Sequence, residues 1–245
     1  MTVDKELFTE KFITAMKCNS LPEFALEALA EKFHVLTERM LTVNEYMNLT
    51  AITDIDGVIL KHYADSLTAS KHIPENASVI DVGCGAGFPS LPLAIARPDL
   101  RITALDSTAK RINYIAETAE MMELTNISCV TARAEELAHD TEYRGMFDIA
   151  CARAVARLNV LCELCIPYVK KGGRFVAMKA NSAEEVAEAA LAVKKLGGKT
   201  VSNDTFSLVS TTGENEPRSV IIIEKISETP ENYPRNNSQI KKKPL

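Results

Sequence analysis

Hydrophobic residues recur at three- and four-residue steps over the first 73 positions of the chain and predict helices there. The spacing indicates a helix pair between residues 4 and 47, broken near residues 20–22. After an interruption at residues 48–50, a helical pattern resumes over residues 56–71. We therefore expect residues 1–73 to form a helical cap.

After Pro74 the pattern changes to short apolar runs that alternate with helical segments. This alternation is typical of a parallel sheet with right-handed crossovers. We expect strands at residues 78–82, 101–106, 127–131, 147–151 and 174–178, and helices at residues 89–97, 109–122, 158–168 and 183–196. Two further apolar runs, 201–209 and 219–226, lack a helix between them and predict a terminal antiparallel pair.

The whole pattern predicts an α/β protein with a Rossmann-like domain over residues 74–227, mostly parallel with the last strand antiparallel. Residues 228–245 form a polar, basic tail with Arg235 and three consecutive lysines, Lys241 to Lys243. We expect this tail to be packed on or flexibly attached to the same domain, and to be mobile in isolation.

Composition excludes some classes of protein without identifying one. The 245 residues are 46% hydrophobic and 25% charged, as in ordinary globular proteins, and contain no apolar run long enough to span a membrane. We expect a cytoplasmic monomer whose six cysteines are reduced. The formal net charge of −5 argues against a non-specific nucleic-acid binder but leaves a local basic surface open.

The most informative stretch is residues 79–88, V-I-D-V-G-C-G-A-G-F, in which a strand that contains Asp81 leads into Gly83, Gly85 and Gly87. Glycines allow the backbone to turn sharply and to approach a ligand closely. The G-x-G-x-G spacing differs from the G-x-G-x-x-G of dinucleotide sites, so the turn alone is a weak signal. We interpret it as part of a candidate cofactor site that also includes Asp81.

Asp106 strengthens this interpretation, because it ends the next strand at the distance where an acidic residue meets ribose hydroxyls. Capping of the following helix is its alternative role. No phosphate-binding loop is present, and the glycine spacing disfavours a pyrophosphate, so S-adenosylmethionine fits best. Its adenine would contact backbone groups near Ala134 and Glu135, although Glu135 could instead serve as a first-turn residue of a short helix.

Several motifs together resemble the GidB family of methyltransferases, which act on N7 of a guanosine in small-subunit (16S) ribosomal RNA. They are N-L-T-A-I (48–52), H-Y-A-D-S-L (62–67), the glycine stretch continued as P-S (79–90), L-D-S (105–107), K-R (110–111), A-R-A-E-E (132–136), A-R-A-V-A (152–156), Y-P-R (233–235) and K-K-P-L (242–245). The resemblance implies a class I S-adenosylmethionine-dependent fold. It places Gly83, Phe88, Ala134, Glu135 and Arg153 at cofactor-contact positions.

The chain departs from the family pattern in two places: before the last strand, at residues 213–218, and in the tail, at residues 233–237. Tail contacts are therefore the least supported part of the resemblance.

The residue chemistry also favours a ring nitrogen as acceptor. No [DN]-P-P-[YF] motif for amine methylation follows the fourth strand, and no cysteine lies where it would activate a pyrimidine ring. Guanine N7 needs neither device, because its lone pair carries no proton. Catalysis then depends on alignment and electrostatics.

Arg153, at the end of the fourth strand, is the first catalytic candidate, because it could reach both the cofactor and the O6 edge of guanine. Its alternative role is an ion pair with Asp148 or a helix carboxylate. Lys179, which ends the fifth strand, is the second candidate, with an ordinary surface lysine as its alternative.

Further basic residues near strand ends predict a positive rim that binds RNA. The candidates are Lys110, Arg111, Arg157 and Arg218. For Lys110 and Arg111, a solvated helix face is an equally good interpretation. In the cap, His62 and Asp65 lie on one helix face and suit a side-chain pair or a cover over the cofactor.

No metal site is expected, because the single C-x-x-C, Cys162 and Cys165, lies within a helix and lacks a second ligand pair. We conclude that the sequence predicts an S-adenosylmethionine-dependent methyltransferase for N7 of a guanosine in 16S ribosomal RNA or the small ribosomal subunit. A small-molecule methyltransferase and a non-catalytic nucleoside-binding regulator are the alternatives.

Overall fold

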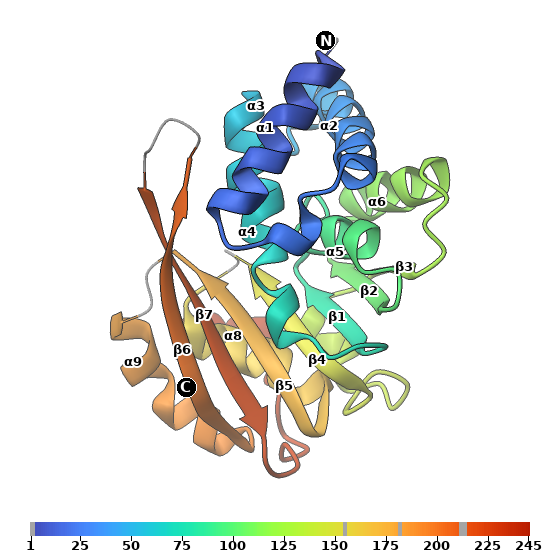
Figure 1. Cartoon of the computed structure of the whole chain (residues 1–245). Coiled ribbons are helices and arrows are strands. Elements are labelled where there is room, and N and C mark those ends of the chain that lie inside the picture. Colours follow the sequence, from blue (N-terminus) through green and yellow to red (C-terminus); the bar gives the residue numbers. More distant parts are fainter. Residues whose placement is uncertain (1–2, 154–155, 181–182, 211–214) are drawn as a thin grey trace.

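The N-terminal third of the chain is helical in a computed structural model that describes residues 3–153, 156–180, 183–210 and 215–245 (Figure 1). Asp4 caps the first helix by accepting a hydrogen bond from the Leu7 backbone, and Asn48, in the left-handed region, ends the second. The helical elements are α1 Lys5–Cys18, η1 Pro22–Phe24, α2 Glu27–Met47, α3 Ile55–Gly57, the π-helical η2 Val58–Ala64, α4 Asp65–Leu67 and η3 Ser70–His72.

The described residues form one seven-stranded sheet in the order β3-β2-β1-β4-β5-β7-β6. Strands β1 to β5 pair in parallel with one another, and β7 is antiparallel to both β5 and β6. The bounds are β1 Ser78–Val82, β2 Arg101–Asp106, β3 Ile127–Thr131, β4 Phe147–Arg153, β5 Val169–Lys179, β6 Gly198–Val209 and β7 Asn215–Lys225. The predicted Rossmann-like fold is confirmed, including its antiparallel end.

Helices cover both faces of the sheet, so consecutive strand residues are buried on opposite sides. In β7, Val220 and Ile222 belong to one hydrophobic cluster, whereas Ile221 and Ile223 belong to another. The helices of the sheet region are α5 Ser90–Ala96, α6 Ala109–Met121, α7 Ala134–Leu137, α8 Leu158–Cys165, η4 Ile166–Tyr168 and α9 Ala183–Lys195. Burial on both faces explains the continuous apolar run of β7, residues 220–223.

The N-terminal helices share a hydrophobic core with the sheet domain. Phe12 of α1 and Phe33 of α2 stack with ring centroids 4.9 Å apart, and they belong to the same cluster as Leu91 of α5 and Ile115 of α6. The cap is thus packed against α5 and α6, the helices beside the sheet (Figure 1). A domain division at residue 73 stays a prediction.

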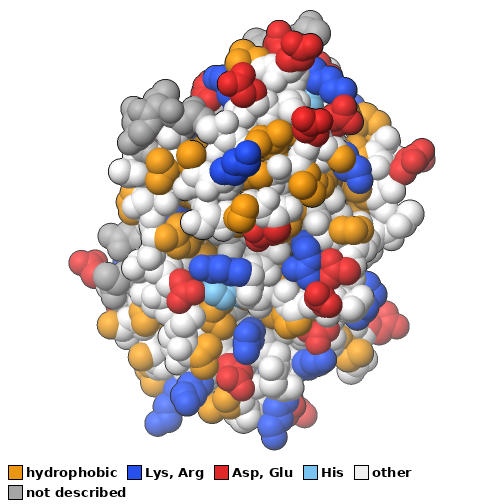
Figure 2. Space-filling view, in the orientation of Figure 1, with side chains coloured by type: hydrophobic (Ala, Val, Ile, Leu, Met, Phe, Trp, Pro, Cys, Tyr) orange, Lys and Arg blue, Asp and Glu red, His pale blue; other side chains and the backbone are white. Residues whose placement is uncertain are grey.

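The surface shows no continuous basic patch on the face seen in Figure 2. Acidic side chains gather at its upper end, over the N-terminal helices, and basic and acidic side chains intermix below them. None of the described helices is both long and apolar enough to cross a bilayer.

The C-terminal tail is packed on the domain through a buried ion pair. The Glu163 carboxylate of α8 is fully buried and accepts hydrogen bonds from Arg235 Nε (2.8 Å), Nη2 (2.6 Å) and backbone N (2.8 Å). Arg144 holds the preceding segment by donating to the carbonyls of Thr229 and Tyr233. The tail then forms α10, Asn237–Lys242. The polar composition of the tail does not predict these contacts, because the partners lie about 70 to 90 residues away in the sequence.

We expect Arg235→Met to lower the free energy of unfolding by about 3 kcal/mol, because it leaves the buried Glu163 carboxylate without its counterion. Arg157→Met is the matched control, since Arg157 pairs with Glu188 across an exposed surface and should contribute less than about 1 kcal/mol. Urea unfolding of both variants measures the difference. Equal losses would contradict the special role of the buried pair.

Candidate functional site

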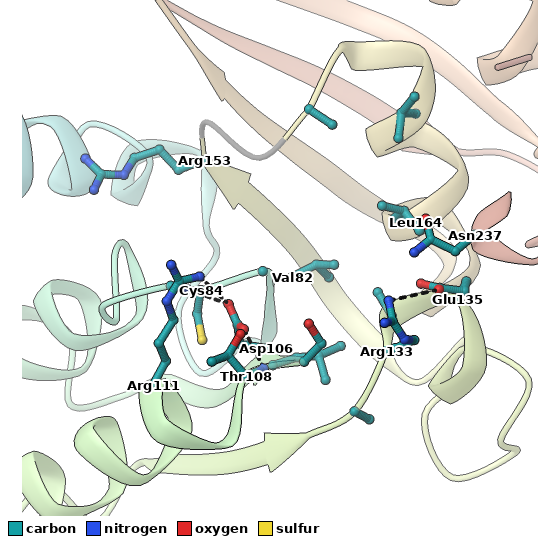
Figure 3. A pocket seen from close by; sticks show the side chains of 18 of the residues that line it. Val82, Cys84, Asp106, Thr108, Arg111, Arg133, Glu135, Arg153, Leu164 and Asn237 are labelled. Atoms are coloured by element: carbon teal, nitrogen blue, oxygen red, sulfur yellow. Dashed lines mark hydrogen bonds and ion pairs between the residues drawn. The ribbon is translucent and has the colours of Figure 1, made fainter. Parts of the chain in front are cut away.

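A cavity of about 600 Å³ lies at the carboxyl ends of β1, β2, β3 and β4 (Figure 3). This edge is where open parallel sheets bind ligands. Of the expected site residues, those that line the cavity are Gly83, Gly85, Phe88, Asp106, Arg111, Ala134, Glu135 and Arg153. The structure thus brings together residues that are up to 70 positions apart in the sequence.

The glycines after β1 differ in what surrounds them. All three have positive φ angles, and the backbone N–H groups of Gly83 and Cys84 donate to the Leu105 carbonyl of β2. A Cβ added to Gly85 would meet nothing within 4 Å, so this residue faces open space in the cavity. A Cβ on Gly87 would lie 2.6 Å from Leu91 Cδ1. Gly87 therefore permits the turn to pack against α5 and does not line the cavity.

Asp106 stabilises the site and faces the cavity at the same time. Its Oδ2 accepts a hydrogen bond from Gly85 N (3.1 Å) and its Oδ1 accepts one from Thr108 N (2.8 Å), just before α6. Arg111 Nη1 lies 3.8 Å from the carboxylate. The alternative capping role and a ligand-binding role are compatible, because a carboxylate has more acceptor positions than these two bonds use.

Asp81 lies outside the cavity. It is fully buried, and its Oδ2 accepts hydrogen bonds from Ser90 N (3.0 Å) and Oγ (2.8 Å), while Oδ1 has no partner in the described part of the chain. Burial raises the pKa of this carboxyl to about 7. Through these hydrogen bonds, Asp81 links β1 to Ser90, the first residue of α5.

Arg153 lines the cavity and pairs with a helix carboxylate from the cap. Its Nη1 donates to the Lys61 carbonyl (2.6 Å) and to Asp65 Oδ2 (3.1 Å), and its guanidinium carbon lies 5.3 Å from the centroid of the Phe88 ring. Asp148, the other partner considered from the sequence, instead binds Ser78 and Lys170. Figure 3 shows Arg153 at one end of the cavity, directed toward the cap.

His62 covers Phe88 in the same cluster. The two rings stack with centroids 4.3 Å apart, His62 Nε2 is 2.8 Å from Thr50 Oγ1, and Nδ1 is 3.4 Å from Arg153 Nη2. Burial, and then the positive charge of Arg153, lower the pKa of His62 to about 3. The neutral ring accepts at Nδ1 and donates from Nε2 to Thr50. His62 and Asp65 therefore both contact Arg153 rather than pairing with each other.

The remaining basic candidates lie outside the cavity. Arg218 Nε donates to Asp65 Oδ1 (3.2 Å), and Lys179 Nζ donates to the Ala156 carbonyl (2.6 Å) and lies 2.9 Å from Glu185. Arg157 is exposed and pairs with Glu188, and Lys110 is exposed on α6. Acidic residues from other elements thus neutralise much of the expected rim, and RNA-binding or catalytic roles at these positions stay predictions.

The opposite end of the cavity contains residues that sequence reasoning missed. Asn237, Ile240 and Lys241 of α10 line it together with Val160 and Leu164 of α8. In Figure 3, Leu164 and Asn237 lie above Glu135, whose carboxylate is 4.0 Å from Arg133. Neither spacing nor periodicity connects the tail with α8. The resemblance of residues 233–235 and 242–245 to the family tail was the one available signal.

Some sequence motifs lead to no ligand site. Cys162 and Cys165 are buried in α8, and burial raises the pKa of both thiols. No metal-binding group of three or more ligand side chains was found among the residues that the structure describes. Within the motif 152–156, Ala154 and Val155 lie outside the described residues, as do positions 213 and 214 of the segment before β7.

The low pKa of His62 predicts a pH dependence of stability. The pKa of His62 is about 3 in the folded protein, against an ordinary value of 6.5, so between these pH values the unfolded state binds more protons. The free energy of unfolding is therefore unaffected by protonation of His62 above about pH 6.5 and decreases as the pH falls below it. From about pH 7 to about pH 5, the wild type should lose up to about 2 kcal/mol more than His62→Gln. Urea unfolding at both pH values measures this, and parallel losses would contradict it.

The chain is similar over most of its length to proteins described as ribosomal RNA small subunit methyltransferases. "Ribosomal RNA small subunit methyltransferase G" of Brevibacillus brevis is 44% identical over 244 residues, which cover 98% of this chain and 99% of that protein. The protein with the same description from Lachnoclostridium phytofermentans is 46% identical over 218 residues, 88% of this chain and 89% of its own.

Solved structures support the fold at lower sequence identity. M. jannaschii TYW2, solved in complex with AdoMet, is 17% identical with a TM-score of 0.51, and the match covers 66% of this chain and 77% of that one. A Pyrococcus horikoshii protein described as a "putative transferase" is 14% identical with a TM-score of 0.52, and the match covers 66% of this chain and 62% of that one.

The family comparison agrees with both results. The model of the GidB family, described as rRNA small subunit methyltransferase G, matches residues 29–211, which include the glycine turn, Asp106 and Arg153. The chain therefore belongs to the GidB family.

Proposed function

We propose that this protein transfers a methyl group from S-adenosylmethionine to N7 of a guanosine in 16S ribosomal RNA, free or within the small ribosomal subunit. The family match over residues 29–211, which spans the cavity-lining ends of β1 to β4, carries this proposal. We further propose that the protein acts in the cytoplasm, where this substrate lies, and as a monomer.

The residues of the cavity fit the proposed cofactor. Gly85 leaves open space where a side chain would otherwise stand, and the Asp106 carboxylate beside it can accept hydrogen bonds from ribose hydroxyls. Val160 and Leu164 provide an apolar wall beyond Glu135. When bound, S-adenosylmethionine supplies an electrophilic methyl group on a sulfonium. A phosphate-free ligand agrees with a cavity that lacks a phosphate-binding loop.

Arg153 is the residue best placed to bind the acceptor base. Its contacts with Asp65 and the Lys61 carbonyl fix the guanidinium at the edge of the cavity, close to Phe88. Its N–H groups could donate to guanine O6 and leave N7 free to react. Methylation at N7 leaves positive charge on the base, so Arg153 would act by holding the base in line with the methyl group, and Asp65 partly neutralises its guanidinium.

No general base is needed for this reaction, and the chemistry of His62 agrees with that. Guanine N7 carries no proton, so none has to be removed before it reacts. A histidine with a pKa of about 3 is a poor proton acceptor near neutral pH. His62 instead stacks on Phe88 and accepts a hydrogen bond from Arg153, which supports a role in positioning.

Mass mapping of 16S ribosomal RNA tests the proposed substrate. We expect one 7-methylguanosine to be absent from cells that lack the protein, and to reappear when their small subunits or RNA are incubated with the purified protein and labelled S-adenosylmethionine. Retention of every 7-methylguanosine in the deletion strain would overturn the assignment. Methylation of small molecules but not of RNA would favour the small-molecule alternative, and binding without transfer would favour the regulator.

Arg153→Ala tests the role of the arginine. We expect kcat/KM to fall about 100-fold, because the variant loses the hydrogen-bond donors that would align the reacting base. Arg101→Ala is the matched control, since Arg101 is exposed at the amino end of β2, away from the cavity. Thermal melting establishes that both variants fold. A kcat/KM for Arg153→Ala within twofold of the control would remove Arg153 from the catalytic residues.

A further inference from the structure

We infer that α10 is part of the cofactor site and that Asn237 recognises the adenine base. This inference rests on the proposed function, because it assigns residues to one end of the same cavity. Arg153 marks the end where the methyl group is transferred, and α10 closes the opposite end, beyond Asp106 (Figure 3). The nucleoside end of the cofactor, with its ribose at Asp106, therefore extends toward α10.

The side chains at this end have the chemistry that a purine requires. Val160, Leu164 and Ile240 provide apolar surface for the faces of a ring, and Ala134 adds little bulk beside them. The Asn237 amide carries both donors and an acceptor, a combination that matches the N6 amine of adenine and a neighbouring ring nitrogen. Within the described chain, the Asn237 side chain makes no hydrogen bond, so its amide is available to a ligand.

The structure holds α10 in place independently of any ligand. Arg235, two residues before Asn237, is bound to the fully buried Glu163, and Asn236 accepts a hydrogen bond from Gln239 N at the start of the helix. Ile240 is only 1% exposed. Glu163 is adjacent to Leu164, so the same turn of α8 anchors the tail and lines the cavity. A preorganised wall of this kind reduces the entropy cost of binding.

The test measures binding of S-adenosylhomocysteine, and of its analogue with hypoxanthine in place of adenine, to the full-length protein by calorimetry. Asn237→Ala should bind S-adenosylhomocysteine roughly tenfold more weakly than the wild type, and should lose most of the wild-type preference for adenine over hypoxanthine. Gln239→Ala is the matched control on the same helix, because Gln239 is exposed and does not line the cavity. It should bind both compounds as the wild type does.

The outcomes separate this inference from the proposed function. If the wild type binds S-adenosylhomocysteine and Asn237→Ala binds it equally well with an unchanged base preference, the inference fails and the proposed function stands. Equal weakening in Asn237→Ala and Gln239→Ala would also overturn the inference, because it would indicate a general effect on α10. If the wild type binds neither compound, the proposed function fails, and the inference fails with it.

Discussion

Three segments that are far apart in the sequence meet at the carboxylate of Asp65, which is only 7% exposed. Oδ2 accepts from Arg153 at the end of β4, and Oδ1 accepts from Arg218 on β7. Without this carboxylate, two largely buried guanidinium groups would face each other with less counter-charge, at a substantial cost in free energy. The position of the cap over the cavity therefore depends on one shared anion as well as on the hydrophobic core.

The helices and strands could be predicted where neighbouring residues in the sequence determine them. The bounds of β1, β2 and β3 agree with the expected strands, because each is an apolar run between turn residues. Strand β5 starts at Val169, five residues earlier than expected, because its polar first half is defined by pairing with β4, where the register shifts after Phe147. Such pairing leaves no hydrophobic pattern in the sequence.

The same distinction applies to the site. Gly85 and Asp106 were predictable because topology alone brings the ends of neighbouring parallel strands together. Ion pairs between distant elements were not: Arg218 is occupied by Asp65, and Lys179 by Glu185. The wall formed by α10 depends on the Glu163–Arg235 contact across 72 residues, which neither composition nor spacing reveals.

Two of the three glycines of the turn, Gly85 and Gly87, are subject to different structural constraints. Gly87 is required by its contact with Leu91 and thus by the fold, whatever the protein binds. A side chain at position 85 would lie in open space. The fold therefore requires there only a residue that tolerates a positive φ, such as asparagine. During evolution, a relative that no longer used the cofactor would keep the glycine at position 87 and be free to lose the one at position 85.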